Sequence, residues 1–178
     1  MAYLLAFGGG APKLASSLGL SKDQGKAAYD NYWMENVGLG KLKEAVEGYY
    51  ETKGKGKYIP AQDGRIVHVR GKNVLLSCLG QGLGAICMSY AACLMDTWLG
   101  ELHIDSLGRP FYLYKGKTVR RISMVHDEYS WEVEDGVQDE VRELSTKAIV
   151  RAGEILKLEI PLAAEGKMER DGSWKDVH

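Results

Sequence analysis

The chain has 178 residues, of which 45% are hydrophobic and 26% are charged, the composition of an ordinary soluble globular protein. This length provides one domain with a real core and excludes two large ones. The 23 basic residues nearly balance the 24 acidic residues, so the net charge indicates no polyanionic partner.

The first third of the sequence is predicted to be helical. We expect helices over residues 1–7, 12–18, 21–33 and 37–49. The first ends at three glycines, as helices commonly do, and Ser21 and Gln24 have the spacing of a capping box. Gly38 and Gly40 predict the break between the last two helices.

A basic stretch follows these helices. A loop over residues 53–57 leads into a hairpin over residues 58–70, whose turn is predicted at Asp63-Gly64. Residues 53–72 contain six basic side chains and one acid, and residues 115–121 contain four basic side chains and no acid. These two patches are either phosphate-binding surfaces or ordinary solvated loops, and the sequence leaves both interpretations open.

The longest apolar stretch predicts a helix over residues 73–99, with Asn73 as its cap. Gln81 and three glycines interrupt it, so we interpret it as a buried core helix and not as a membrane span. Each glycine inside a helix costs about 1 kcal/mol relative to Ala. Gly80, Gly82 and Gly84 therefore indicate a close approach, either by another helix or by a nucleic-acid backbone.

The last third alternates strands with one helix. Strands are expected over residues 111–114, 118–124, 129–133 and 160–164, and a helix capped by Asp135 is expected to extend to residue 155. Helices first and hairpin-linked strands later indicate an α+β fold with an antiparallel sheet.

Charged residues interrupt this strand pattern. His126, Asp127 and Glu128 stand between two strands, which places them at the tip of a hairpin. Asp is common in tight turns, so a plain turn is one interpretation. A metal site is the other, because Mg²⁺ binds one or two carboxylates together with water and substrate phosphate oxygens.

Segments across the whole chain follow a family pattern. In chain order they are YLLAFG at residues 3–8, DGRIVHVR at 63–70, LGQGLGA at 79–85, VHDE at 125–128 and SWKDVH at 173–178. They resemble motifs of family A DNA polymerases, the polymerase I superfamily, and the bacteriophage-type branch is nearest. The resemblance implies a partial fingers segment over residues 1–52. It also implies a palm over residues 53–178, with an antiparallel sheet and long packed helices.

The resemblance also implies roles for individual residues. Asp127 and Glu128 would be catalytic and would hold Mg²⁺, and His126 would contact the primer terminus. Gln81 would bind the DNA minor groove, with Arg65 and Arg70 as further DNA contacts. The nucleotide-binding positions would be Tyr3, Phe7 and Gly8, and His178 is a further candidate site residue. Phe7 stands where the family usually has Tyr, so a hydroxyl contact is lost.

The thumb, the Asp of motif A and most of motif B have no counterpart in this sequence. We therefore expect the C-terminal part of a split polymerase, a DNA-directed DNA polymerase that is inactive without an N-terminal partner fragment. Its other partners would be DNA primer-template and dNTP, with no membrane, in the cytoplasm. The alternatives are a non-catalytic DNA-binding remnant or accessory protein, and an unrelated α+β interaction protein.

Overall fold

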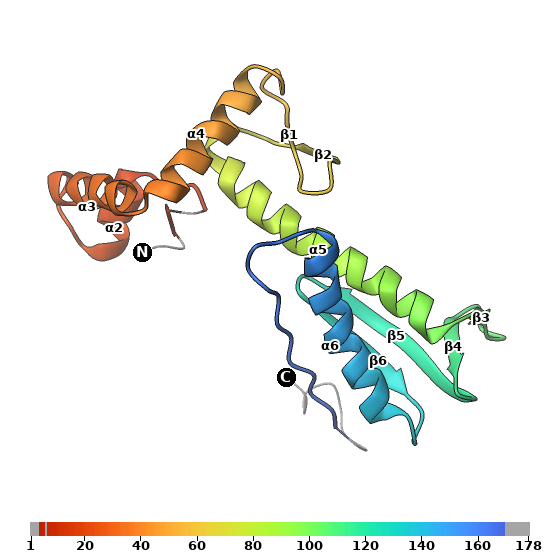
Figure 1. The fold of residues 1–178 in the computed structure, drawn as a ribbon. Coiled ribbons are helices and arrows are strands. Elements are labelled where there is room, and N and C mark those ends of the chain that lie inside the picture. Colours follow the sequence, from red (N-terminus) through yellow and green to blue (C-terminus); the bar gives the residue numbers. More distant parts are fainter. Residues whose placement is uncertain (1–3, 6, 170–178) are drawn as a thin grey trace. The chain divides into compact units, whose positions relative to one another are not determined.

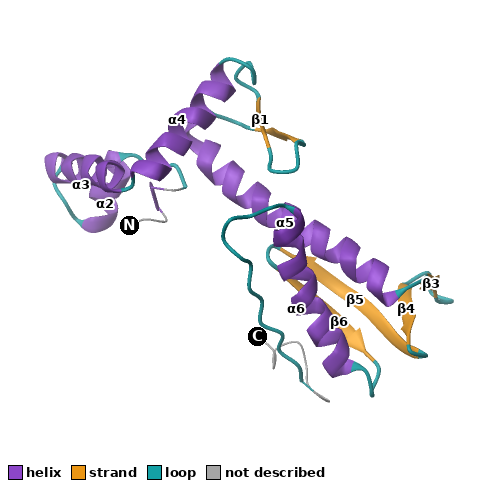
Figure 2. Cartoon of the chain, in the orientation of Figure 1, coloured by secondary structure: helices purple, strands orange, loops and turns teal. Residues whose placement is uncertain are grey.

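The structure is a computed structural model that describes residues 4, 5 and 7–169 (Figure 1). Its elements, in chain order, are α2 (Ala11–Leu18), α3 (Lys22–Glu35), α4 (Val37–Glu51), β1 (Tyr58–Pro60), β2 (Ile66–His68), the 3₁₀ helix η1 (Lys72–Val74), α5 (Leu75–Leu99), β3 (Leu102–Ile104), β4 (Pro110–Tyr114), β5 (Lys117–Val125), β6 (Glu128–Val133) and α6 (Gln138–Ile155). Figure 2 shows helices followed by antiparallel strands and a further helix, which confirms the predicted α+β class.

The chain forms two compact units, Met1–Leu83 and Gly84–His178. The division falls inside α5, which begins in the first unit and ends in the second. The division expected from the resemblance, fingers to residue 52 and palm from residue 53, follows function instead of packing and stays a prediction.

The helices of the first unit are fixed by local signals. The Ser21 side chain accepts a hydrogen bond from the Gln24 backbone N–H, and the Gln24 side chain accepts one from the Ser21 N–H, as predicted for a capping box. The break between α3 and α4 lies at Asn36. The prediction that Gly38 and Gly40 form this break was wrong, because both glycines lie within α4.

The second half of the first unit is the predicted hairpin. β1 and β2 pair antiparallel, and Gly64 in their connection has φ 84°, the left-handed region that favours glycine. Ile59 and Val69 are buried together with Tyr50 of α4 and Leu75 of α5. This small core holds the hairpin against the start of the long helix.

The second unit contains a four-stranded antiparallel sheet in the order β3-β4-β5-β6. Tyr112 and Val119 on one face are buried with residues of α5 and α6, namely Ala91, Met95, Leu99, Val141, Ala148 and Ala152. β4 and β5 are joined through Lys115 and Gly116, whose φ values of 52° and 75° give the backbone twist that a two-residue hairpin needs.

α5 has buried residues at its start and along its second half, and an exposed turn between them. The stretch Lys72–Leu99 is long and apolar enough to cross a membrane by length and composition alone. Leu75 belongs to the core of the first unit, and Met95 and Leu99 belong to that of the second. The prediction of a core helix therefore holds at both ends, while the turn around Gln81 is exposed.

Three predictions in this part of the fold were wrong. Asn73 does not cap α5 but lies within η1, and Asp135 does not cap α6 but accepts a hydrogen bond from the Gln138 side chain. Residues 160–164 form no strand of a sheet among the described residues. The short strand β3 was not predicted.

The capping box gives a test of the helical segment. Ser21→Ala should lower the free energy of unfolding by about 1 kcal/mol, because a backbone N–H at the start of α3 loses its acceptor. Urea unfolding measures the change, with Ser17→Ala, an exposed position inside α2, as the matched control. Equal effects of the two substitutions would contradict a capping role for Ser21.

Candidate active site

The candidate site is built on the turn between β5 and β6. The predicted hairpin is present, but Val125 pairs with Glu128, so His126 and Asp127 alone make the connection and Glu128 begins β6. His126 has φ 53°, a conformation that is uncommon for a residue other than glycine. All three charged or titratable residues of the tip, His126, Asp127 and Glu128, are exposed.

The alternation of side chains along β6 shows on which face of the sheet Glu128 lies. The hydroxyl of Tyr129 donates a hydrogen bond to the Ser145 carbonyl of α6 at 2.6 Å, so Tyr129 faces the helices. Burial raises the pKa of Tyr129 to about 12, which keeps this hydroxyl protonated as a donor. Successive strand residues face opposite sides, so Glu128 and Ser130 lie on the other face of the sheet. There the Ser130 hydroxyl lies 3.5 Å from a Glu128 carboxylate oxygen.

Asp127 differs from four other acids of this unit. Asp96, Asp105, Glu132 and Glu134 each form an ion pair with a basic residue of β5. Among residues 4, 5 and 7–169, Asp127 forms neither an ion pair nor a hydrogen bond. None of these residues therefore occupies the coordination positions of its carboxylate.

The residues at the tip fit part of a Mg²⁺ site. Exposed carboxylates are the ligands that Mg²⁺ prefers, and the ion needs only one or two of them if water and phosphate complete its shell. Within the described part of the chain, no group of three His, Cys, Asp or Glu side chains is close enough to hold a metal. A complete two-metal centre therefore needs a further carboxylate from outside this group.

The basic patch over residues 115–121 is neutralised by ion pairs. Lys115 binds Glu140 at 2.5 Å, Lys117 binds Glu134 at 2.7 Å and Arg121 binds Asp96 at 3.3 Å. The hydrogen bond from Lys115 lowers the pKa of Glu140 and that from Lys117 lowers the pKa of Glu134. Arg120 is paired as well, with Asp105 and Glu132. This patch is therefore not a free phosphate-binding surface.

The patch in the first unit is only partly neutralised. Lys72 binds Glu47 and Glu51, and Arg65 binds Asp63 at 2.6 Å. The hydrogen bond from Arg65 lowers the pKa of Asp63 and holds the guanidinium beside the hairpin turn. Sequence reasoning did not identify Asp63 as this orienting partner, although it stands two residues from Arg65.

Other basic side chains of this patch stay available. In the part of the chain that the structure describes, Arg70, Lys55 and Lys57 have no ion-pair partner, and all three are exposed. Arg65 and Arg70, the two predicted DNA contacts, thus belong to the same hairpin, but only the Arg65 side chain is held by an ion pair. Arg65 is oriented by Asp63, whereas Arg70 follows β2 without such a partner.

Gln81 lies on an open face of α5. A Cβ atom at Gly80 or Gly84 would meet no described atom within 4 Å, and one at Gly82 would meet only a Val67 methyl group, at 3.8 Å. No other described helix therefore packs against these glycines, and that interpretation of them was wrong. Gln81 stands between them and is itself exposed.

The end of the first predicted helix is anchored near the start of α5. Leu4 and Leu5 are helical, and the Gly9 N–H donates to the Leu4 carbonyl at 2.8 Å. A Cβ at Gly8 would lie 1.8 Å from the Asn73 carbonyl oxygen, and Gly8 has φ 85°, so only glycine fits there. Phe7, beside it, is 44% exposed. Tyr3 and His178 lie outside the described residues.

The conformation of His126 gives a test that separates its backbone role from any chemical role. His126→Val should lower the free energy of unfolding by about 1 kcal/mol, because the left-handed region is unfavourable for L-residues, most of all β-branched ones. His126→Gly should not lower it. Urea unfolding of both variants decides, with Ser123→Val in β5 as the control for a branched residue at an ordinary strand position. A stable His126→Val protein would show that the turn does not need this conformation.

Two phage DNA polymerases are similar in sequence to nearly the whole of this chain. The chain is 26% identical over 183 residues to a DNA-directed DNA polymerase of Escherichia phage Phieco32, covering 99% of this chain and 27% of the relative. It is 24% identical over 188 residues to the DNA-directed DNA polymerase of Enterobacteria phage T3, covering 99% of this chain and 25% of the relative. No model of a known protein family matches the sequence.

A solved structure has the same fold. The POL domain of Pol1 from M. smegmatis, in complex with DNA primer-template and dNTP, matches 85% of this chain and 26% of that chain, with a TM-score of 0.69 and 22% identity. The chain thus spans about a quarter of the length of the proteins it matches. It is a homologue of phage DNA-directed DNA polymerases with the fold of part of a polymerase domain.

Proposed function

We propose that this chain supplies the palm and part of the fingers of a family A DNA polymerase and takes part in template-directed nucleotidyl transfer. The observation that carries the proposal is the tip of the β5–β6 hairpin, where Asp127 is exposed and, among the described residues, unpaired. Similarity to phage DNA polymerases over 99% of the chain supports the same assignment.

Residues of this chain would have defined roles in nucleotidyl transfer. The primer hydroxyl attacks the α-phosphate of the incoming nucleotide, a new phosphodiester bond forms and pyrophosphate leaves. Mg²⁺ bound at such a site lowers the pKa of the attacking hydroxyl and stabilises the charge on the phosphate oxygens. Asp127 would provide the main ligand, with Glu128 in a supporting position one residue further on. The two-residue turn between the paired residues Val125 and Glu128 would position the Asp127 backbone.

The remaining predicted residues would position the substrates. His126 lies next to Asp127 in the turn and would contact the primer terminus. Gln81, on the open face of α5, would reach the minor groove, where its glycine neighbours allow a close approach. Arg65 and Arg70 of the β1–β2 hairpin would contact DNA phosphates, and Phe7 and Gly8, with Tyr3, would border the nucleotide.

Activity would require the rest of a polymerase. The relatives are about four times as long as this chain, and a second metal ligand must come from outside the described acidic groups. We propose that this chain works together with the missing polymerase segments, including the motif A carboxylate, as an N-terminal partner fragment. Its place of action would be the cytoplasm of the host.

The first prediction of this proposal concerns the 178-residue chain alone. It should not extend a primer, because one carboxylate pair cannot hold two metals in the geometry of the reaction. Primer extension with Mg²⁺ and dNTP measures this, and circular dichroism of the same sample controls for folding. Extension by the chain alone that disappears in Asp127→Ala would contradict the dependence on other segments.

A second prediction concerns Asp127 in the assembled polymerase. Asp127→Asn should lower single-turnover incorporation by roughly 10²- to 10³-fold, the range for losing one group that stabilises charge in a transition state. DNA affinity should change little, because phosphate contacts come from basic residues. Glu128→Gln should cost less than Asp127→Asn.

The two interpretations of the hairpin tip differ in this experiment. If Asp127 were only a turn residue, Asn would replace it almost without effect, since both residues are common in turns. Near-normal incorporation by Asp127→Asn would thus favour the alternative that the chain is a non-catalytic DNA-binding protein. Measurements at one fixed salt concentration keep the comparison of affinities valid.

A further inference from the structure

The strand β5 contains one residue more than its pairing with β6 requires. Arg121 pairs with Trp131 and Ser123 pairs with Ser130, so Ile122 between them has no partner residue in β6. The Ile122 side chain is 65% exposed, so packing does not account for the extra residue either. This bulge lies near the end of the strand that leads into the candidate metal site.

The bulge is not needed for the pairing of the hairpin or for the burial of its side chains. Directly opposite residues of an antiparallel pair share a face. The residues of β5 that face the helices are Val119, Arg121 and, beyond the bulge, Met124. Their spacing is two residues and then three, whereas their partners in β6 follow one another at a constant spacing of two. Removal of Ile122 would therefore restore a regular alternation and leave every pair on its present face.

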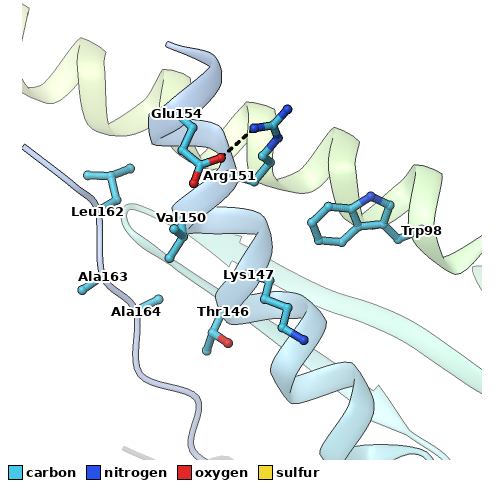
Figure 3. Close-up of a pocket in the computed structure, with 9 residues that line it drawn as sticks. All are labelled: Trp98, Thr146, Lys147, Val150, Arg151, Glu154, Leu162, Ala163 and Ala164. Carbon is cyan, nitrogen blue, oxygen red and sulfur yellow. Dashed lines mark hydrogen bonds and ion pairs between the residues drawn. The ribbon is translucent and has the colours of Figure 1, made fainter. Parts of the chain in front are cut away.

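A ligand pocket does not explain the bulge. A pocket of this unit is lined by Trp98 of α5, by residues of α6 and by residues 162–164 (Figure 3). None of the residues that line this pocket belongs to β5 or β6. The extra residue thus contributes neither to the strand pairs nor to the core nor to this pocket, and its role lies elsewhere.

The strand is held in place immediately before the bulge. The Arg121 guanidinium binds Asp96 of α5 at 3.3 Å and lies over the Trp131 ring, 5.7 Å from the ring centre. Asp96 also accepts a hydrogen bond from the Tyr112 hydroxyl at 2.6 Å. Burial raises the pKa of Tyr112 to about 12, so this hydroxyl stays protonated as a donor. The residue before the bulge is therefore tied to α5.

The hairpin is held again beyond the bulge, by the other helix. Met124 lies opposite Tyr129, whose hydroxyl donates a hydrogen bond to the Ser145 carbonyl of α6 at 2.6 Å. The Tyr129 ring also packs edge-on against the Trp131 ring, with 5.7 Å between the ring centres. The bend thus lies between two anchor points on different helices, so the packing of the unit sets its direction.

A small change of direction at the bulge would displace the turn by a catalytically large distance. The strand continues for three residues beyond Ile122, roughly 10 Å at about 3.3 Å per residue. A change of about 10° in its direction therefore moves the turn by more than about 1.5 Å, whereas catalytic groups need to be held within about 0.5 Å. Bulges bend a strand, increase its twist and occur next to active sites, where they re-aim a side chain.

We propose that the bulge at Ile122, anchored by Arg121, is a positioning element of the metal site. It directs the hairpin tip so that Asp127 meets Mg²⁺ and the substrate phosphates in the assembled polymerase. This inference rests on the proposed function of Asp127. Ile122 and Arg121 act through the direction of the strand and not by contact with the substrates. A local irregularity that brings no benefit to folding is expected where function requires it.

Deletion of Ile122 separates positioning from folding. In the 178-residue chain, the urea midpoint of the deletion variant should be no lower than that of the unchanged protein, because every cross-strand pair is kept. Proton contacts between Met124 and Tyr129, measured by NMR, should persist. A lower midpoint or a shifted pair would make the bulge a requirement of folding and would overturn the inference.

The same deletion should impair the assembled polymerase. Single-turnover incorporation should fall roughly 100-fold, the effect of a misplacement of about 1 Å. The affinity for Mn²⁺, the probe ion in an EPR titration, should fall at least about tenfold. Ile122→Ala keeps the extra residue and should recover both quantities. A wild-type value of either quantity in the deletion variant would contradict the inference, and so would the loss of both in Ile122→Ala.

The anchor is tested by Arg121→Met, which removes the ion pair but keeps a long side chain. The Mg²⁺ concentration for half-maximal incorporation should rise roughly tenfold, as for other groups that orient metal ligands, and Arg121→Lys should restore most of it. Lys117→Met, the matched control, breaks the ion pair with Glu134 at the opposite end of β5 and should leave the Mg²⁺ dependence unchanged. Equal shifts in the two Met variants would refute the anchoring role of Arg121.

Asp127→Asn in the same assembly separates this inference from the proposed function. If Asp127→Asn incorporates normally, the catalytic assignment fails, and the positioning role fails with it. If Asp127→Asn loses incorporation while the Ile122 deletion does not, the catalytic assignment stands and only the positioning role fails.

Discussion

The register of the β5–β6 hairpin is the constraint on which the candidate site depends. Val119 and Val133 pair, as do Arg121 and Trp131, and a bulge between Arg121 and Ser123 resets the pairing before the tip. Tyr129 and Trp131 then face the helices, where burial fixes them. A slip by one residue would expose this aromatic face to water and bury the opposite one. The position of Asp127 at the turn is therefore set by the packing of aromatic residues two and four positions later.

The bulge has a further consequence for the tip. It adds one residue to β5 relative to β6, so Ile122 is left without a partner and is exposed. Bulges bend a strand and increase its twist locally. The bulge thus links a buried, regular half of the hairpin to an exposed half that carries the acids.

Local chemistry explains which parts of the fold could be predicted. The capping box at Ser21, the Asp63-Gly64 turn and the hairpin tip at Asp127 each depend on residues within a few positions of one another. The predicted helix starts at Asn73 and Asp135 were wrong, because Asn73 lies within η1 and Asp135 accepts a competing hydrogen bond from the Gln138 side chain. The strand predicted over residues 160–164 was wrong, because this segment pairs with no strand among the described residues.

Charge was the least predictable property of the site. The four basic residues between 115 and 121 appear unopposed in the sequence, yet every one has an acidic partner. The sequence separations of these pairs, such as 25 residues between Lys115 and Glu140, conceal them from any local pattern. Conversely, no local pattern in the sequence reveals that Asp127 has no ion-pair partner among the described residues. Its isolation becomes visible only when the ion pairs of the sheet are known.

Free strand edges constrain how such a unit can exist. Proteins usually blunt an exposed edge with lysines, proline, bulges or a covering element, because unpaired backbone groups promote association. β6 carries no lysine and no proline, and the bulge lies on β5, not on its outer edge. Among the described strands, β6 is therefore an outer strand whose free edge carries no lysine, proline or bulge, and its unpaired backbone groups favour association with another strand.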